Sequence, residues 1–245
     1  MQSCPTSSAF TIFPVQILRA IPLHQIRLLV FDLDGTLIDS RTDLVQSVNA
    51  TMRHFGRKDL PGDIIASYIG DGAGMLVRRA LGDPDDEHLV TEALGYFLAY
   101  YREHKLDFTT TYPGVIESLT TLAAQPDPPT MAVLTNKPVG PSIAIVNALG
   151  LAPYFFRVYG GDSFHSKKPD PHGLLTLIQE AGTLPEHTIM IGDSDVDVLT
   201  AQNAGAWSVG CLFGLAPHTL ATDPPDVLVD SPDEWPLTLA RYQQS

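Results

Sequence analysis

The pattern of hydrophobic and polar residues divides the chain into a helical stretch set between strand-rich parts. Residues 26–31, with the sequence IRLLVF, form a β-branched and aromatic run that predicts a buried strand. From Arg41 to about Thr111 no comparable run follows, and apolar residues instead recur at helical spacing, as in residues 89–101. Residues 41–111 are therefore expected to form a separate small helical unit.

Helices and strands alternate from residue 112 onward. Strands are expected at 130–134, 157–159, 188–191, 207–209 and 226–229, and helices at 115–124, 139–149, 172–181 and 195–204. Gly150, Gly182 and Gly205 follow the last three helices, at the position where a left-handed residue commonly ends a helix. This alternation predicts an α/β fold with a doubly wound parallel sheet, a Rossmann-like core.

The expected domains follow from these two patterns. Residues 25–40 and 112–245 are assigned to the α/β core, and residues 41–111 to a small α-helical domain inserted into it. Residues 1–24 stand outside both patterns, and prolines interrupt their apolar stretch, which argues against a secretory leader. They are interpreted as an N-terminal extension, or alternatively as the product of a start codon placed too early.

The charge balance restricts the partners. The chain has 245 residues, with 15 Lys and Arg against 28 Asp and Glu, and a formal net charge of −13. Such an acidic protein repels phosphate backbones and anionic membranes, and no apolar run approaches the roughly 18 residues that span a bilayer. Cys4 and Cys211 lack metal-binding spacing, which favours reduced thiols and a cytoplasmic location. Neither nucleic acid nor a membrane is expected as a partner.

Polar residues follow several of the expected strands. Because ligands bind outside the carboxyl ends of the strands in an open parallel sheet, these residues are expected to meet at one edge. Two of the acids, Asp32 and Asp34, lie two positions apart, so an extended backbone turns both carboxylates to the same side. The residues concerned, in chain order, are Asp32, Asp34, Thr135, Asn136, Lys168 and Asp193.

The acids among them indicate a metal site. Neighbouring carboxylates repel each other, and a divalent cation relieves that repulsion. Asp32, Asp34 and Asp193, without a nearby His or Cys cluster, suit a hard ion such as Mg²⁺. The alternative is that these acids only cap helices and form turns, since Asp-Gly is a common turn.

Four segments resemble the sequence motifs of the haloacid dehalogenase-like hydrolase superfamily. They occur in the order that the superfamily has, within residues 26–230. Within it the chain looks most like the phosphoglycolate phosphatases, on the evidence of residues 68–81, 112–115 and 161–162. The four motif segments are DLDGTL at 32–37 with Asp39 and Ser40, LTNK at 134–137, KPDP at 168–171, and IGDS at 191–194 with Asp197.

The resemblance implies a reaction and a role for each residue. It implies Mg²⁺-dependent hydrolysis of a small phosphate monoester, 2-phosphoglycolate above all, with the helical domain as a cap over the site. Asp32 is expected to attack phosphorus and form an aspartyl-phosphate, and Asp34 to protonate the leaving alcohol and then activate water. A side-chain oxygen of Asp32, the backbone carbonyl of Asp34 and Asp193 are expected to hold the metal. The Thr135 hydroxyl, the Asn136 amide and the Lys168 ammonium are expected to bind the phosphoryl oxygens.

Two further residues stay open between a functional and a structural interpretation. Asp197 either orients a metal-bound water or is an acid on a helix face, and Arg79 either contacts a substrate carboxylate or forms a surface salt bridge. Ser194 and Asp195 are also open between a role in the site and an ordinary role as helix N-cap residues.

Other activities are compatible with the same motifs. A phosphosugar phosphatase or a phosphomutase of the same superfamily shares them, and a phospho-accepting signalling domain also combines Asp, Thr and Lys on a doubly wound fold. The length and the inserted helical unit argue against the last. The expected partner is a small phosphorylated metabolite, and the expected state is a monomer or homodimer.

Overall fold

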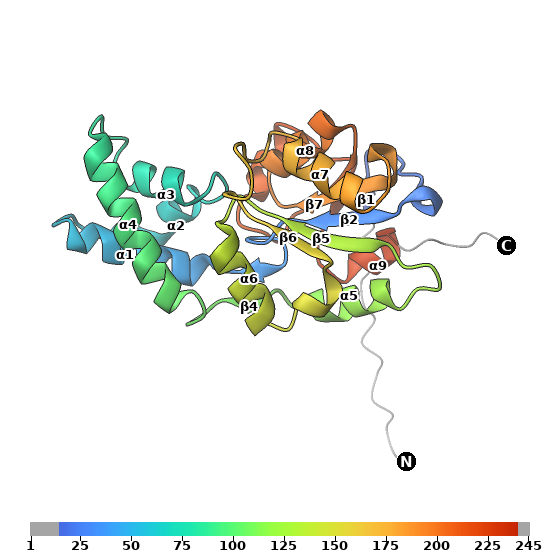
Figure 1. Ribbon diagram of the computed structural model, residues 1–245, viewed down its shortest axis with the longest axis horizontal. Coiled ribbons are helices and arrows are strands. Elements are labelled where there is room, and N and C mark those ends of the chain that lie inside the picture. Colours follow the sequence, from blue (N-terminus) through green and yellow to red (C-terminus); the bar gives the residue numbers. More distant parts are fainter. Residues whose placement is uncertain (1–14, 240–245) are drawn as a thin grey trace, which may run out of the picture.

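A seven-stranded sheet forms the centre of the core in the computed structural model, which describes residues 15–239 (Figure 1). Its strand order is β1-β9-β8-β7-β2-β5-β6, and every neighbouring pair is parallel except β1 with β9. This confirms the predicted α/β fold. The strands are β1 Gln16–Ile17, β2 Leu28–Phe31, β5 Thr130–Leu134, β6 Arg157–Tyr159, β7 Thr188–Gly192, β8 Trp207–Cys211 and β9 Val227–Val229.

The register of the three central strands sets the place of the site. Phe31, the last residue of β2, lies opposite Val133 of β5 and Ile191 of β7. The chain passes from β2 to β5 on one side and later returns to β7 on the other, so the strand order reverses at β2. Ligands bind at such a switch point, next to the carboxyl ends of the strands.

Helices cover both faces of the sheet (Figure 1). On one face Leu29 and Phe31 pack with residues of α5, α6 and α9, and on the other Leu28 and Val30 pack with α7 and α8. Alternate residues of a strand thus pack into two separate hydrophobic clusters, one on each face of the sheet. The helices are α5 Val115–Ala123, α6 Val139–Ala148, α7 His172–Glu180, α8 Asp195–Ala204 and α9 Glu234–Leu239, with short 3₁₀ helices at Leu23–Gln25, Ala152–Tyr154, Pro185–His187 and Pro217–Ala221.

The helical insertion has a hydrophobic core of its own. Its helices are α1 Arg41–His54, α2 Gly62–Ala66, α3 Ala73–Ala80 and α4 Glu87–His104. Val48, Leu76 and Phe97 are buried among them, which confirms the helical pattern seen in the sequence. Figure 1 shows these helices as a body beside one end of the sheet. We propose residues 41–111 as this cap domain and 25–40 with 112–245 as the catalytic core.

Two short strands mark where the chain leaves and re-enters the core. β3, Ile38–Asp39, pairs antiparallel with β4, Thr110–Thr111. Ile38 lies opposite Thr111, so the two ends of the cap are side by side. Within residues 15–239, no helix is both long and apolar enough to cross a membrane.

Part of the expected N-terminal extension contributes to the sheet. Residues 1–14, including Cys4, lie outside the described residues, but β1 pairs with β9 as an edge strand. Arg19 contacts the carboxylate of Asp226 and lies over the Trp207 ring, 4.5 Å from its centroid. Sequence patterns did not indicate this strand because two residues are too short to show a period.

Candidate active site

Three buried carboxylates cluster at the carboxyl ends of β2 and β7. Asp32, Asp193 and Asp197 each offer an oxygen within 4.8 Å of the others. Asp32 directly follows β2, and its backbone amide donates to the Ile191 carbonyl of β7 at 2.8 Å. Of the two interpretations of Asp197, this geometry supports a place in the site rather than on an exposed helix face.

Backbone and hydroxyl groups fix the direction of two of these acids. Asp193 Oδ2 accepts hydrogen bonds from the amides of Leu215 and Ala216 at 2.6 and 3.0 Å. Asp197 Oδ2 accepts from the amide and the hydroxyl of Ser194 at 3.2 and 2.8 Å. Ser194 is the N-cap of α8, one of the interpretations left open by the sequence, and the start of this helix also orients an acid of the cluster.

Lys168 supplies a positive charge to the cluster. Its Nζ lies 2.8 Å from Asp32 Oδ1 and 2.6 Å from Asp197 Oδ1, and its side chain is 4% exposed. Burial alone would lower the pKa of Lys168, but the Asp197 and Asp32 carboxylates raise it above the ordinary lysine value. The ammonium is therefore charged at neutral pH.

The acids still outnumber the cations. Burial raises the pKa of Asp193 to about 8, and the nearby Asp197 and Asp32 carboxylates add to that effect. Burial also raises the pKa of Asp32 to about 6, although Lys168 opposes the shift. Asp32 Oδ1 is buried without a hydrogen bond even though the Lys168 ammonium is close. Three carboxylates share the positive charge of one ammonium, and a hard divalent cation bound by their oxygens would balance the remaining negative charge. The structure thus supports a metal site.

Thr135 and Asn136 lie at the end of β5, as predicted. Both are buried, and the Thr135 amide donates to the Tyr159 carbonyl at 3.0 Å. The Asn136 side-chain amide donates to the carbonyls of Gly70 and Lys168, at 3.1 and 3.0 Å. Its side chain therefore joins the cap loop to the loop that carries Lys168, a contact that the sequence did not indicate.

Asp34 is placed apart from the three-acid cluster. Its carboxylate accepts from Ser40 Oγ at 2.5 Å and pairs with Lys137 Nζ at 2.9 and 3.0 Å. Among the described residues, the grouped acids are Asp32, Asp193 and Asp197. The expected contribution of Asp34 to the metal was its backbone carbonyl, and that stays a prediction. Lys137 was given no role from the sequence, although it is the last residue of the LTNK segment and that place could have suggested one.

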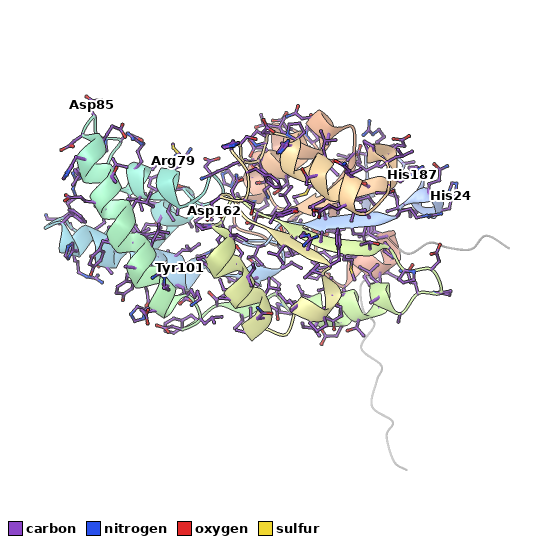
Figure 2. The ribbon with its side chains drawn as sticks, viewed as in Figure 1. His24, Arg79, Asp85, Tyr101, Asp162 and His187 are labelled. Atoms are coloured by element: carbon purple, nitrogen blue, oxygen red, sulfur yellow. The ribbon has the colours of Figure 1, made fainter. Side chains whose placement is uncertain are left out.

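A cavity of about 50 Å³ lies between the core and the cap. Asp32, Asp34, Thr135, Lys137, Lys168 and Asp193 line it from the core. The cap closes it with apolar side chains that include Leu76, Phe97 and Tyr101, and Figure 2 shows Tyr101 on α4 at the side facing the core. The site is therefore charged on the core side and mainly apolar on the cap side.

Arg79 lines a neighbouring cleft of about 500 Å³ rather than this cavity. Its guanidinium lies 2.6 Å from Asp71 Oδ2, and both side chains are partly exposed. Figure 2 places Arg79 on α3, within the cap. Of its two interpretations, the structure supports the salt bridge.

Comparison with known sequences decides the family. Residues 29–211 match the family described as haloacid dehalogenase-like hydrolase. The chain belongs to this family. The resemblance seen in the motifs is thereby confirmed, and the haloacid dehalogenase-like fold accounts for the parallel sheet with its helical insertion.

Relatives within the family carry a narrower name. A phosphoglycolate phosphatase of Neisseria meningitidis serogroup A is 38% identical over 202 residues, covering 81% of this chain and 85% of that protein. One of Pseudomonas putida is 41% identical over 197 residues, covering 77% and 70%. The crystal structure of a predicted phosphoglycolate phosphatase from Haemophilus somnus shares the fold with a TM-score of 0.80 and 31% identity, covering 86% and 96%. This haloacid dehalogenase-like hydrolase is thus similar to phosphoglycolate phosphatases over most of its length.

Proposed function

We propose that the protein is a Mg²⁺-dependent phosphatase that hydrolyses 2-phosphoglycolate to glycolate and phosphate through an aspartyl-phosphate on Asp32. The observation that carries the proposal is the buried group of Asp32, Asp193 and Asp197 with the Lys168 ammonium at 2.6 to 2.8 Å, at the carboxyl ends of β2 and β7. The names of the relatives support the choice of substrate.

The residues that would hold the metal are Asp32, Asp193 and the backbone carbonyl of Asp34, with Asp197 beside them. When bound, Mg²⁺ supplies positive charge that reduces the repulsion between a phosphate dianion and these carboxylates. The excess of acids over Lys168 and the raised pKa of Asp193 support this assignment.

The chain's own side chains divide the chemistry among them. A carboxylate oxygen of Asp32 attacks phosphorus, the bond from phosphorus to the leaving oxygen breaks, and Asp34 gives its proton to that oxygen. Asp34 then takes a proton from water, which attacks the phosphoryl group and releases phosphate and the free Asp32 carboxylate. The Thr135 hydroxyl, the Asn136 amide and the Lys168 ammonium stabilise the negative charge on the phosphoryl oxygens.

The cap side of the cavity offers few polar partners for the hydroxyl groups of a sugar, which supports a smaller leaving group. This side is apolar, and Lys137 and Lys168 are the cations that line the cavity among residues 15–239. We take the partner to be a small phosphorylated metabolite rather than nucleic acid or a membrane, because the net charge is −13. We also propose that the protein is cytoplasmic and that it is a monomer or a homodimer. The free, buried thiol of Cys211 agrees with a reducing compartment.

The test is phosphate release by the purified protein with a panel of phosphate monoesters. Asp32→Asn is expected to abolish Mg²⁺-dependent release from 2-phosphoglycolate, and Asp85→Asn, an exposed cap residue, serves as the matched control. Substantial activity in Asp32→Asn would contradict the nucleophile. If a phosphosugar is hydrolysed far faster than 2-phosphoglycolate, the assigned substrate is wrong, but the assignment as a phosphatase still holds. Phosphate transfer within a sugar that needs a bisphosphate activator would indicate a mutase.

A further inference from the structure

Lys137 lies where the core meets the cap and contacts one group from each. Its Nζ is 2.9 and 3.0 Å from the two carboxylate oxygens of Asp34, and it lies over the Tyr101 ring, 4.6 Å from the centroid. The side chain of Lys137 is 4% exposed and that of Asp34 is 12% exposed. A residue of α4, far from Asp34 in sequence, thus covers the cation that Asp34 binds.

The charge of Lys137 depends on these contacts. The two Asp34 oxygens at 2.9 and 3.0 Å favour the charged ammonium. The face of an aromatic ring attracts a cation, and more strongly when water is excluded. Tyr101 provides such a face and also excludes water, since it is 2% exposed. The Asp34 to Lys137 pair is therefore sheltered by the cap.

The adjacent residue makes a second contact with the cap. The Asn136 side chain donates to Gly70 of the cap loop and to the carbonyl of Lys168. Asn136 and Lys137 lie two and three residues after the end of β5, so both are close to a fixed point of the sheet. Two neighbouring core residues therefore contact the cap, and each also contacts a proposed catalytic residue: Asn136 the backbone of Lys168, and Lys137 the side chain of Asp34.

We propose that Lys137 is a positioning residue that, when covered by Tyr101, holds the Asp34 carboxyl group in the place from which it protonates the leaving oxygen. This inference rests on the proposed function. It makes proton transfer depend on the closed cap, because removing Tyr101 exposes the ammonium to water and loosens its hold on Asp34. Neither Lys137 nor Tyr101 need touch the substrate for this role.

Two kinds of phosphate ester differ in how much they need the proton of Asp34. When the bond from phosphorus to the leaving oxygen breaks, the electron pair goes to that oxygen. An alkoxide such as that of glycolate is a poor leaving group and needs the proton of Asp34, whereas p-nitrophenolate leaves without one. A misplaced Asp34 should therefore slow hydrolysis of 2-phosphoglycolate far more than that of p-nitrophenyl phosphate.

The experiment measures kcat and KM for both esters in the full-length protein with Mg²⁺. Lys137→Met, which keeps the chain length and removes the charge, is expected to lower kcat for 2-phosphoglycolate roughly 100-fold and kcat for p-nitrophenyl phosphate less than about 5-fold, within the range of general acid catalysis. Lys137→Arg keeps the charge and should restore much of the ratio between the two rates. Tyr101→Leu should change that ratio in the same direction as Lys137→Met, while Tyr101→Phe, which keeps the ring, should retain it.

Two controls keep the result interpretable. Tyr100→Leu removes the neighbouring ring of α4, which stacks on His104 and does not line the cavity, and should leave both rates unchanged. Circular dichroism reports folding of each variant, and if Lys137→Met does not fold, the pair Tyr101→Leu and Tyr101→Phe carries the test. An equal loss on both esters would contradict positioning of Asp34. Absence of phosphate release from both esters by the unchanged protein would contradict the proposed function, and the positioning role with it.

Discussion

The buried carboxylate of Asp43, in the first turn of α1, accepts hydrogen bonds from both the amide and the hydroxyl of Thr109, at 2.9 and 2.6 Å. The amide of Phe108 donates to the same carboxylate at 3.1 Å. Asp43 therefore joins the segment that enters the cap to the segment that leaves it. The side chain of Asp43 therefore holds the start of α1 and the segment that precedes β4 together.

Asp43→Ala is expected to lower the free energy of unfolding by roughly 3 kcal/mol, because it leaves two buried donors of Thr109 and the partly buried amide of Phe108 without this partner. Urea denaturation followed by circular dichroism measures this change. Asp85→Ala, an exposed acid of the cap (Figure 2), should change it by less than about 0.5 kcal/mol. Equal stability of the two variants would show that the Asp43 contacts contribute nothing.

Lys168→Met is expected to lower phosphate release at least roughly 100-fold, since it removes a charge-stabilising group from the site. It also leaves the buried carboxylates of Asp32 and Asp197 without their cation, so the metal-free protein should melt at a lower temperature. Lys167→Met changes the adjacent, exposed lysine and is the matched control for both measurements. A similar loss of activity in the two variants would remove the special role of Lys168.

The pH dependence of stability follows from Asp32 and Asp193. Folding raises the pKa of Asp32 to about 6 and that of Asp193 to about 8, from an ordinary value of 3.8. Between about pH 4 and pH 8 the folded state binds more protons than the unfolded state, so the stability of the metal-free protein should fall as the pH rises through this range. Below this range both acids are protonated in either state, and the difference vanishes.

Thermal melts in EDTA and in Mg²⁺, from pH 5 to pH 8.5, measure this dependence. The increase in melting temperature caused by Mg²⁺ should grow with pH, because protons compete with the metal for the same carboxylates. Asp193→Asn should flatten the curve measured in EDTA. A metal-free stability that rises steadily from pH 5 to pH 8 would contradict the raised pKa values.

Gly35 lies against Asp193, so that a Cβ atom at position 35 would be 2.2 Å from Asp193 Oδ2. Gly35→Ala should therefore displace this carboxylate and weaken the apparent affinity for Mg²⁺ roughly 10-fold or more. Gly82→Ala tests the backbone alone, because Gly82 has a similar φ of +81° against +88° and no atom within 4 Å of the added Cβ. Activity titrated with Mg²⁺ gives the affinities, and equal values for both variants would exclude the contact with Asp193 as the cause.

The main strands and helices could be predicted from the sequence because their patterns are long enough to show a period. Strands β1, β3 and β4 have two residues each, and α9 contains Pro236, so none of them gave a signal. The confirmed strands in turn explain why Asp32, Thr135 and Asp193 were expected at one edge, since each directly follows a parallel strand.

The pairing within the site could not be predicted in the same way. Asp34 and Lys137 are 103 positions apart, and their contact depends on how two loops turn after leaving the sheet. The position of Tyr101 in the helical pattern indicated a buried residue of the cap, and it is buried there. That its ring also covers Lys137 follows only from the placement of α4 against the core, which no local pattern encodes.

The adjacent ends of the cap bear on how this protein can change over evolutionary time. Ile38 and Thr111 are paired neighbours, so the helical insertion leaves and re-enters the core at one short two-stranded ribbon. The central sheet therefore does not restrict how many residues the insertion contains. The acids and lysines that line the cavity come from outside the insertion, whereas Leu76, Phe97 and Tyr101 come from within it. The residues of the insertion that face the leaving group can therefore be replaced over time while the acids and lysines of the core stay the same, provided that the ring of Tyr101 over Lys137 is kept.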